Sequence, residues 1–432
     1  MHSELFRIPI RWAGVPIFGF GLLLAAWLAA TAWGMMRTAK QHGWPAALRA
    51  HLPTALIVAA IIVWGVPTLF PDGMPIRGYG VMVLAGSVLA ILLAIRRAEQ
   101  ANLPTEEILA MAVPLFGCGV IGARLFYVVQ FWQTRIRQPT LAASLVEALK
   151  FTEGGLVVYG ALIGAAIGCV WHFRRRRLPL LAMSDLVAPS LLVGVALGRI
   201  GCFLNGCCYG GESTRPWAVT FPQFSAPNSI SPPYADQAAS GRFYGFRWGN
   251  QSIDDAKQDA SVAIDRVDAS SPAEQARLKI GDAIAAINGE LTPTRQHAEA
   301  ALLDALIAGR PVELRLADGS LRTIAAIDPP PRSRPVAPAQ LFSALDAALL
   351  AWLLWSYYPF RRHEGETTAL LLTLHPISRF LLEIVRVDEA AVFGTGLSIS
   401  QNISIALFVV GIALWCWLLR KPPKLDFPLP PT

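Results

Sequence analysis

Long runs of apolar residues make up most of the chain, and short segments rich in Lys, Arg, Pro or Gly separate them. A helix that crosses the hydrocarbon core of a bilayer needs about 20 mostly apolar residues. We therefore predict nine membrane-spanning helices, near residues 16–36, 54–70, 79–95, 108–131, 155–173, 186–204, 340–358, 367–385 and 402–419. An alternative for the first run is a signal peptide, because Ala30-Thr31-Ala32 resembles a cleavage site, although the run is long for one.

The distribution of positive charge predicts the direction in which these helices cross the membrane. Cytoplasmic loops carry an excess of Lys and Arg. The segments after the odd-numbered predicted spans hold fourteen Lys and Arg, including the run 174–177, whereas the short segments on the opposite side hold seven. We therefore expect a cytoplasmic C-terminus and an outer N-terminus, with the long stretch 205–339 also on the outer side.

The stretch 205–339 is polar, and it is rich in Asp, Ser and Pro. Residues 223–250 have the Pro, Ser, Asn and Gly content of a loop. Residues 260–328 predict a small α/β module, because strand-like alternation, hairpin turns and an amphipathic helical run follow one another. Three prolines at 329–331 predict a linker back to the membrane.

The expected fold class is a polytopic α-helical membrane protein with an inserted α/β module. The predicted organisation is two extra N-terminal transmembrane helices in 1–75, the first part of a membrane core in 76–222, a loop in 223–250, the module in 251–328, a Pro-rich linker in 329–336, the second part of the core in 337–420 and a cytoplasmic tail in 421–432.

Composition supports a membrane protein and excludes other classes. Of 432 residues, 54% are hydrophobic and 16% are charged, against roughly a quarter charged in soluble globular chains. These values exclude a disordered protein, a collagen-like chain and a compact soluble enzyme as descriptions of the whole. We attribute the net charge of +7 to Lys and Arg near lipid headgroups, and we expect no nucleic-acid partner. The six cysteines suggest no disulfide framework, and none has C-x-x-C zinc spacing.

A recognisable motif ends the sixth predicted span. The sequence Gly198-Arg199-Ile200-Gly201-Cys202-Phe203-Leu204-Asn205-Gly206 resembles the signature G-R-x-G-N-F-x-N-G-E of the prolipoprotein diacylglyceryl transferase family. Other segments similar to family motifs follow in the expected order: Arg77-Gly78-Tyr79-Gly80, Gly122-Ala123-Arg124, a Gly-rich stretch from Gly154-Gly155-Leu156 to Gly164, Pro216-Trp217-Ala218-Val219, Phe221-Pro222, Gln340-Leu341 after Pro338, and Arg379, Glu383 and Arg386. Together these segments cover about 75–222 and 337–420.

The resemblance implies a transferase of the bacterial inner membrane. Such an enzyme moves a diacylglyceryl group from phosphatidylglycerol to the lipobox cysteine thiol of a prolipoprotein signal peptide. A thioether forms and glycerol phosphate leaves. We expect no cofactor and no bound metal.

The sequence departs from the family pattern at four positions. The histidine of the Gly-rich span is Tyr159, the signature Asn is Cys202 and its Glu is Cys207, and the Glu after the Gln-Leu motif is Ser343. These departures leave two alternatives open. One is another lipid- or thiol-group transferase on the same scaffold, and the other is a catalytically silent membrane adaptor that recruits partners.

The soluble module contains a recognisable stretch that runs from Ser271-Pro272-Ala273, through Gly281-Asp282, to Ile287-Asn288-Gly289. In this stretch the module resembles a PDZ domain of the envelope type. PDZ domains bind extended peptides or C-termini by strand addition. The resemblance therefore implies a peptide ligand, with the carboxylate-binding loop near Gly245-Phe246.

The implied reaction needs a group that holds the lipid phosphate while its negative charge grows. Arginine suits this role because it is planar, permanently charged and bidentate. Arg199 and Arg386 are candidates for the catalytic centre, and Arg124 and Arg77 are candidates for substrate binding. The alternative for each is an arginine that only extends towards the headgroups.

The group that deprotonates the acceptor thiol is left open. Tyr159 and Tyr79 are catalytic candidates that would orient phosphate or thiol, although a phenol with a pKa of about 10 is a weak base at neutral pH. Arginine could instead lower the pKa of the incoming thiol. Further substrate-binding candidates are Asn205, Gly198, Gly201, Glu383 and Gln340. Helix packing, an aromatic belt and an internal charge network are their alternative roles.

Cys202, Cys207 and Cys208 are candidates for a thiol role. The outer side of a bacterial membrane is oxidising. Four interpretations stay open, which are a disulfide, a metal site that lacks a fourth ligand, a reactive thiol relay and a purely structural role.

Overall fold

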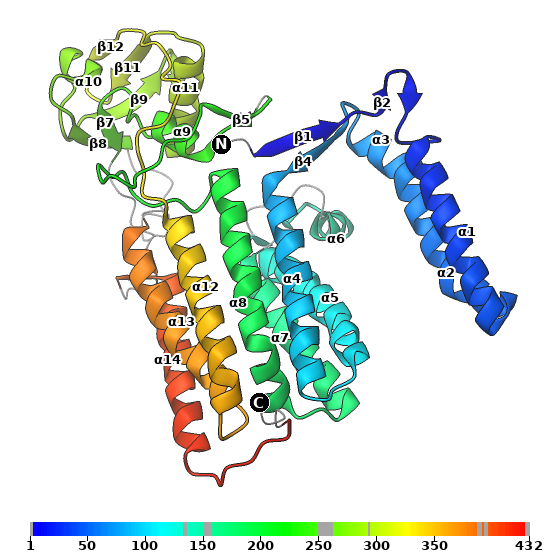
Figure 1. Cartoon of the computed structure of the whole chain (residues 1–432). Helices are drawn as coiled ribbons and strands as arrows, with labels where there is room; N and C mark the ends of the chain where they lie inside the picture. The colour runs from blue at the N-terminus through cyan, green and yellow to red at the C-terminus, as the bar shows by residue number, and fades with distance from the viewer. Residues whose placement is uncertain are drawn as a thin grey trace.

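A computed structural model of the chain describes residues 3–132, 136–150, 155, 157–227, 229–248, 262–292, 294–386, 391–392 and 396–427. Gly154, Leu156 and the segment 249–261, on which parts of the sequence predictions fall, lie outside the described residues. The described part comprises a bundle of long helices, a helical hairpin beside it and a small module at one end (Figure 1).

Seven long helices of the described chain form the bundle. They are α4 (Gly78–Gln100), α5 (Thr105–Gln130), α7 (Val158–Arg176), α8 (Leu180–Asn205), α12 (Ala339–Tyr357), α13 (Glu366–Val385) and α14 (Ile399–Leu418). Helix α8 lies between α4 and α12, while α5 packs against α7 and α13 packs against α14 (Figure 1). The short helix α6 (Leu141–Leu149) follows α5, and the strands β13 (Ala391–Val392) and β14 (Leu397–Ser398) pair just before α14.

Glycines explain the close packing of α5 against α7. A Cβ atom added to Gly122 would lie 2.8 Å from the Cα atom of Gly164, closer than real Cβ contacts come. Gly160 and Gly168 of α7 would likewise meet the α5 backbone or side chains. The Gly-rich motif therefore lets two helix backbones approach, as small residues do in membrane bundles.

The N-terminal region forms a hairpin that stands beside the bundle (Figure 1). Its elements are β1 (Glu4–Ile8), β2 (Arg11–Trp12), β3 (Val15–Pro16), α1 (Leu22–His42), α2 (Trp44–Ala60), a π-helical turn (Ile61–Gly65), α3 (Val66–Leu69) and β4 (Met74–Arg77). Strand β1 pairs antiparallel with β4, the strand that leads into α4. This pairing ties the N-terminal segment to the start of the bundle.

The described helices confirm a polytopic α-helical membrane protein. Seven segments are long and apolar enough to cross a membrane, and they are Leu22–His42, Trp44–Leu69, Gly78–Gln100, Thr105–Gln130, Leu180–Asn205, Ala339–Phe360 and Ile399–Leu418. Helices α7 and α13, of 19 and 20 residues, lie alongside them in the bundle and are not among these seven segments. The count of nine spans stays a prediction.

The module contains a six-stranded antiparallel sheet and three short helices. The strand order is β12-β11-β9-β8-β7, with β10 paired to β9. The bounds are α9 (Pro232–Ala239), β7 (Phe246–Trp248), β8 (Val262–Val267), α10 (Pro272–Gln275), β9 (Ala283–Ile287), β10 (Glu290–Leu291), α11 (Arg295–Ile307), β11 (Val312–Leu316) and β12 (Leu321–Ile324). Alternate residues of β11 are buried, because one face of the sheet covers an apolar core.

The loop predicted for residues 223–250 is wrong for much of that range. It contains β5 (Phe224–Ala226), β6 (Ser229–Ile230), α9 and β7. The aromatic side chains in it join the apolar core of the module, and Tyr234, Tyr244, Phe246 and Trp248 are each at most 2% exposed. Pro, Ser and Gly dominate the local composition, yet the scattered aromatic residues decide the structure because their burial dominates core energetics.

Two extended segments connect the module to the bundle. Val219 and Val336 exchange backbone hydrogen bonds of 3.0 and 2.9 Å, and Pro222 is bridged to Arg332. Closer to the membrane, Gly210 donates to the carbonyl of Ala337 at 2.8 Å and is also bridged to Arg386. The turn after α8 is therefore fixed to the start of α12 and to the end of α13.

Candidate functional site

The signature motif lies in the last turns of α8, at the end of the bundle that faces the module (Figure 1). Asn205 is the last residue of α8, and Gly206 ends the helix with a φ of 76°, a left-handed conformation that glycine adopts without strain. Tyr79, Tyr159 and Gln340 are each the second residue of α4, α7 and α12, respectively. The fold brings these predicted residues, far apart in sequence, to one end of the bundle.

The two signature glycines have different surroundings. A Cβ atom added to Gly201 would lie 3.1 Å from Cδ2 of Tyr79 and 3.2 Å from Cβ of Met82, so this glycine lets α8 approach α4. A Cβ atom added to Gly198 would meet nothing within 4 Å. Gly201 therefore positions Tyr79 against α8, whereas Gly198 borders open space beside Arg199.

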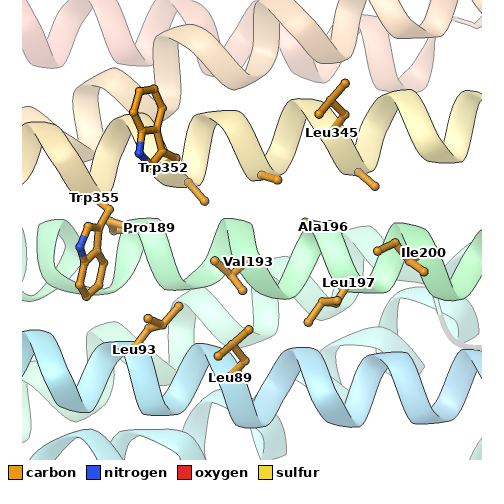
Figure 2. A pocket seen from close by; sticks show the side chains of 13 residues that line it. Leu89, Leu93, Pro189, Val193, Ala196, Leu197, Ile200, Leu345, Trp352 and Trp355 are labelled. Atoms are coloured by element: carbon orange, nitrogen blue, oxygen red, sulfur yellow. The ribbon is translucent and has the colours of Figure 1, made fainter.

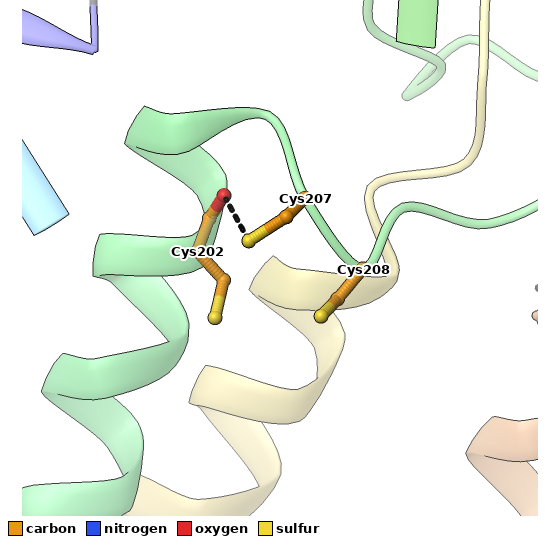
Figure 3. Close-up of side chains that lie close together, drawn as sticks. All are labelled: Cys202, Cys207 and Cys208. Atoms are coloured by element: carbon orange, nitrogen blue, oxygen red, sulfur yellow. Dashed lines mark hydrogen bonds between the residues drawn. The ribbon is translucent and has the colours of Figure 1, made fainter. Parts of the chain in front are cut away.

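The three cysteines converge at the end of α8 (Figure 3). Their Sγ atoms all lie within 4.8 Å of one another. Cys202 is on the last turn of the helix, and Cys207 and Cys208 follow its glycine cap. The buried side-chain amide of Gln340, 1% exposed, donates to the carbonyl of Cys207 at 2.8 Å. The sequence prediction had not linked Gln340 to the cysteine turn.

Two arginines place positive charge beside this cluster. Thiol contacts from Cys202 and Cys207, and then the charges of Arg386 and Arg199, lower the pKa of Cys208. Asn205 also interacts with the side chain of Cys207. Contact with Cys208 and burial raise the pKa of Cys207. The positive charge of the two arginines therefore favours a single thiolate, at Cys208, or another anion in its place.

Arg199 differs from the other arginines of this region. It is partly buried in α8, and in the described part of the chain its guanidinium makes neither a hydrogen bond nor an ion pair. It acts electrostatically on Tyr79, Cys208 and His375. An arginine inside a membrane helix is costly unless something pairs with it. Arg199 is thus available for an anionic ligand.

Arg386 belongs to a network on α13 and α14. The carboxylate of Glu383, 5% exposed, pairs with Nη1 of Arg379 at 2.5 Å and with Nη1 of Arg386 at 3.8 Å. Arg379 also donates to Oγ of Ser400 at 2.8 Å, and that oxygen lies 2.6 Å from the hydroxyl of Tyr159. Tyr159 is therefore connected through Ser400 and Arg379 to the Glu383–Arg386 pair.

Ser400 is the residue of this network that sequence reasoning missed. It lies in the first turn of α14, where Ser398 and Gln401 form a capping box. That capping pattern signals a helix start and was visible in the sequence. The hydrogen bond between Ser400 and Tyr159 joins two helices that are distant in the sequence, α7 and α14, and had no local signal.

Arg124 and Arg77 lie at the same end of the bundle, and the guanidinium of Arg124 binds backbone carbonyls. The guanidinium of Arg124, 6% exposed, donates to the carbonyls of Glu147 and Ala148 at 2.8 Å each and to that of Gly155 at 3.2 Å. Arg77 is exposed and precedes the first residue of α4. Their predicted role in substrate binding stays a prediction.

An apolar groove of about 570 Å³ runs along the bundle between α4, α8 and α12 (Figure 2). It is lined by side chains that include Leu89, Val193, Leu197, Ile200, Ala348 and Trp352. Ile200 follows Arg199 in α8, so one end of the groove lies next to the polar cluster. The site thus joins an apolar channel to a positively charged end.

Residues 67–417 match the sequence profile of the family described as prolipoprotein diacylglyceryl transferase. The chain belongs to that family. A protein of Rhodopirellula baltica named phosphatidylglycerol–prolipoprotein diacylglyceryl transferase is 32% identical over 95% of this chain and 88% of its own length. Relatives of the same name from Clostridium tetani and Corynebacterium efficiens are 36% and 34% identical over 36% and 34% of this chain, and over 60% and 44% of their own lengths.

Membership in the transferase family confirms some of the sequence predictions and leaves others untested. The match with the Rhodopirellula baltica protein covers 95% of this chain and so includes residues of the module, whereas the other two relatives align over about a third of the chain. The family resemblance read from separate motifs in the sequence is confirmed. The PDZ resemblance and the roles of single residues stay predictions.

Proposed function

We propose that this protein transfers a diacylglyceryl group from phosphatidylglycerol to the cysteine thiol of prolipoprotein signal peptides. The observation that carries the proposal is Arg199, a partly buried guanidinium without a hydrogen bond or ion pair in the described residues. It precedes Ile200, a lining residue of the apolar groove, in the same helix. A phospholipid presents the complementary pattern, which is a phosphate next to two acyl chains.

We propose that the lipid phosphate binds between Arg199 and Arg386. Both act electrostatically on Cys208, so both lie near the turn after α8. As the C–O bond to phosphate breaks, charge grows on the leaving glycerol phosphate, and preorganised donors stabilise that charge. Glu383 holds Arg386 in position through an ion pair, and Tyr159 supports the same network through Ser400. Asn205 and Tyr79 border the acceptor thiol.

The acyl chains are placed in the groove between α4, α8 and α12. Burying chain methylenes stabilises binding by about 0.8 kcal/mol for each CH₂ group. Trp352 is 69% exposed, so the groove is open along its side to the lipid in which the chain would lie. The proposed headgroup and tail positions are thus continuous along α8.

Filling the groove tests this placement. We expect Ala348→Trp to raise the KM for long-chain phosphatidylglycerol at least tenfold, because the new side chain would occupy the groove, and to affect short-chain lipid less. The matched control is Leu349→Trp on the adjacent, 55% exposed position outside the groove. Initial rates measured at graded concentrations of each lipid give the KM of both variants for long-chain and for short-chain phosphatidylglycerol. Equal behaviour of the two variants towards both chain lengths would contradict the placement.

We further propose nine spans in the bacterial inner membrane. These are the seven segments that are apolar enough to cross a membrane and, in addition, α7 and α13. The charge asymmetry of the sequence supports an outer N-terminus, an outer module and a cytoplasmic C-terminus. This orientation places Arg199, Arg386 and the cysteine turn on the outer side.

Topology reporters test the orientation. A reporter joined after Arg177 is expected to read as cytoplasmic. One inserted in the turn at Gly319, between β11 and β12, is expected to read as external. Alkaline phosphatase and a fluorescent protein give opposite signals at each position. The reverse pair of results would place Arg199 on the cytoplasmic side and contradict an envelope reaction.

The module is proposed to be PDZ-like and to bind an extended segment of a partner protein. Its antiparallel sheet and its Ser271 N-cap on α10 support this proposal. Phe246, expected near a carboxylate-binding loop, lies instead in β7, where it pairs with β8 and is 1% exposed. The side chain of Phe246 therefore belongs to the core of the module and is not available to a peptide.

A cell-based test decides whether the protein performs the transfer. The chain is expressed in bacteria depleted of their own diacylglyceryl transferase, together with a lipobox reporter. We expect growth to be restored and the reporter to gain one diacylglyceryl group by mass spectrometry. A membrane-inserted protein that leaves the reporter unmodified would favour the catalytically silent adaptor.

A further inference from the structure

The cysteine cluster has properties that the phosphate and acyl sites do not explain. Its three Sγ atoms lie within 4.8 Å of one another, and the side chains are directed together from the helix end and from the turn (Figure 3). The three cysteines are free in the structure and partly exposed, so they are accessible to a ligand. They occupy positions where the family signature has Asn and Glu at two of the three sites.

The backbone holds this turn in place before any ligand arrives. The amide of Cys207 donates to the carbonyl of Cys202 at 3.1 Å, and Gln340 holds the carbonyl of Cys207 at 2.8 Å. Cys208 has a φ of 59°, and two residues later Gly210 is bound to Ala337. The turn is fixed at both ends, so the three sulfurs are preorganised.

Three thiolates on a rigid turn match the donor set that thiophilic metal ions prefer. Zinc binds thiolate sulfur at about 2.3 Å, which places sulfur atoms of a tetrahedral site about 3.8 Å apart. The Sγ atoms of the present cluster, within 4.8 Å of one another, are within about 1 Å of that spacing or closer. Zinc sites with three protein ligands keep the fourth position open for water or substrate.

The surrounding charge suits such a site. Three thiolates and one divalent cation carry a net charge of −1, and a fourth thiolate would make it −2. Arg199 and Arg386, whose charges act on Cys208, supply two compensating positive charges. A buried or partly buried anion is stable when cations of this kind lie beside it.

We propose that Cys202, Cys207 and Cys208 bind one zinc-type metal ion and that the acceptor cysteine of the prolipoprotein completes its coordination. The second half of this proposal rests on the proposed function. A coordinated thiol loses its proton at neutral pH. The acceptor thiol would then need no general base, although Tyr159 stands in place of the family's histidine.

The chemical step balances without an oxidant or a reductant. The acceptor thiol releases its proton to solvent when its sulfur joins the site. The sulfur then donates an electron pair to the glycerol carbon of the lipid and forms a C–S bond. The C–O bond to phosphate breaks, and its electron pair leaves with glycerol phosphate. The product thioether is a neutral, weaker ligand, so it dissociates.

Metal binding is tested on the purified full-length protein in detergent, prepared under reducing conditions. We expect about one Zn²⁺ per chain after exhaustive dialysis. Replacement by Co²⁺ should give thiolate-to-metal charge-transfer absorption. Cys202→Ser, Cys207→Ser and Cys208→Ser should each weaken Zn²⁺ affinity at least tenfold. The matched control is Cys416→Ser, an exposed cysteine near the opposite end of the bundle, which should bind as the parent does.

The acceptor role has its own readout. A lipobox peptide added to the Co²⁺ form should increase the charge-transfer absorption, and the same peptide with Ser in place of Cys should not. A folded parent protein that retains no Zn²⁺, or cysteine variants that bind as Cys416→Ser does, would overturn the metal site. So would a disulfide between two of the three cysteines, detected by differential alkylation in freshly isolated membranes.

The outcomes separate this inference from the proposed function. Lipid transfer that persists at full rate after metal removal by a chelator overturns the acceptor half of the inference and leaves the proposed function intact. Zn²⁺ binding with an acceptor-dependent spectrum, but without transfer from any phosphatidylglycerol, overturns the proposed function and leaves the metal site. Zn²⁺ binding with no spectral response to the peptide overturns the acceptor half alone.

Discussion

Replacing Arg199 by lysine is expected to reduce turnover by about 10²–10³-fold, the typical cost of losing one preorganised donor to a developing anion. Lysine keeps the charge but lacks the planar fork that binds a phosphate through two parallel hydrogen bonds. Arg199 makes neither a hydrogen bond nor an ion pair in the described part of the protein, so its replacement removes no such interaction there. Lipid transfer to a lipobox peptide by purified variants measures the effect.

Two comparisons make the Arg199 result interpretable. Arg199→Ala should lose at least as much activity as Arg199→Lys, and both variants should keep the parent melting temperature. Arg96→Lys, at an exposed position at the other end of the neighbouring helix α4, should remain fully active. Near-full activity of Arg199→Lys with unchanged thermal stability would show that Arg199 only extends towards the headgroups and has no part in the mechanism.

Deleting the module along its structural boundary is expected to leave a folded membrane core, whereas a shorter deletion is expected to destroy it. The backbone amide of Gln223 lies 3.1 Å from the carbonyl oxygen of Pro331. A short Gly/Ser turn can therefore replace residues 224–330. Removing only 251–328 would instead leave Tyr234, Tyr244, Phe246 and Trp248 without the core that buries them.

Membrane yield and size-exclusion profiles of the two deletion proteins measure this difference. We expect the 224–330 deletion to be monodisperse and to retain transfer activity with altered acceptor preference. We expect the 251–328 deletion to aggregate or to be degraded, because an exposed patch of large aromatic side chains favours association. Equal membrane yields and equal size-exclusion profiles of the two proteins would mean that packing of these aromatic residues against the rest of the module does not stabilise the fold.

The helical part of the fold could be predicted because its signal is local. The apolar runs and the family motifs located α4, α8 and α12 and the residues at their ends. Packing then brought Tyr79, Gln340 and Asn205 together, as the common end of the predicted spans implied. In lipid, a spanning segment must satisfy its backbone hydrogen bonds internally, and few structures other than a helix do so. An apolar run in the sequence therefore predicts a helix directly.

The module boundary and the polar network could not be predicted in the same way. Tyr234 and Trp248 lie in a segment with loop composition, and their burial depends on strands that follow later in the chain. The contact of Tyr159 with Ser400 joins α7 to α14 across 241 residues. Such contacts depend on tertiary packing, for which one sequence without aligned relatives offers no periodic signal.

The cysteine cluster shows a third kind of limit. Its spacing, with four residues between Cys202 and Cys207 and then an adjacent cysteine, lacks the C-x-x-C pattern of zinc sites. The glycine cap at Gly206 and the left-handed Cys208 fold the turn back, so thiols with an unusual spacing meet in space. The backbone conformation of Gly206 and Cys208, which the spacing of the cysteines does not reveal, brings the three thiols together.

The most direct measurement combines purified protein, phosphatidylglycerol and a synthetic lipobox peptide, and follows the peptide by mass spectrometry. We predict that the peptide gains one diacylglyceryl group on its cysteine sulfur, that an equal amount of glycerol phosphate is released, and that a Ser-containing peptide stays unmodified. A folded preparation that binds phosphatidylglycerol but forms no thioether, or that modifies the Ser peptide equally well, would contradict the transferase assignment.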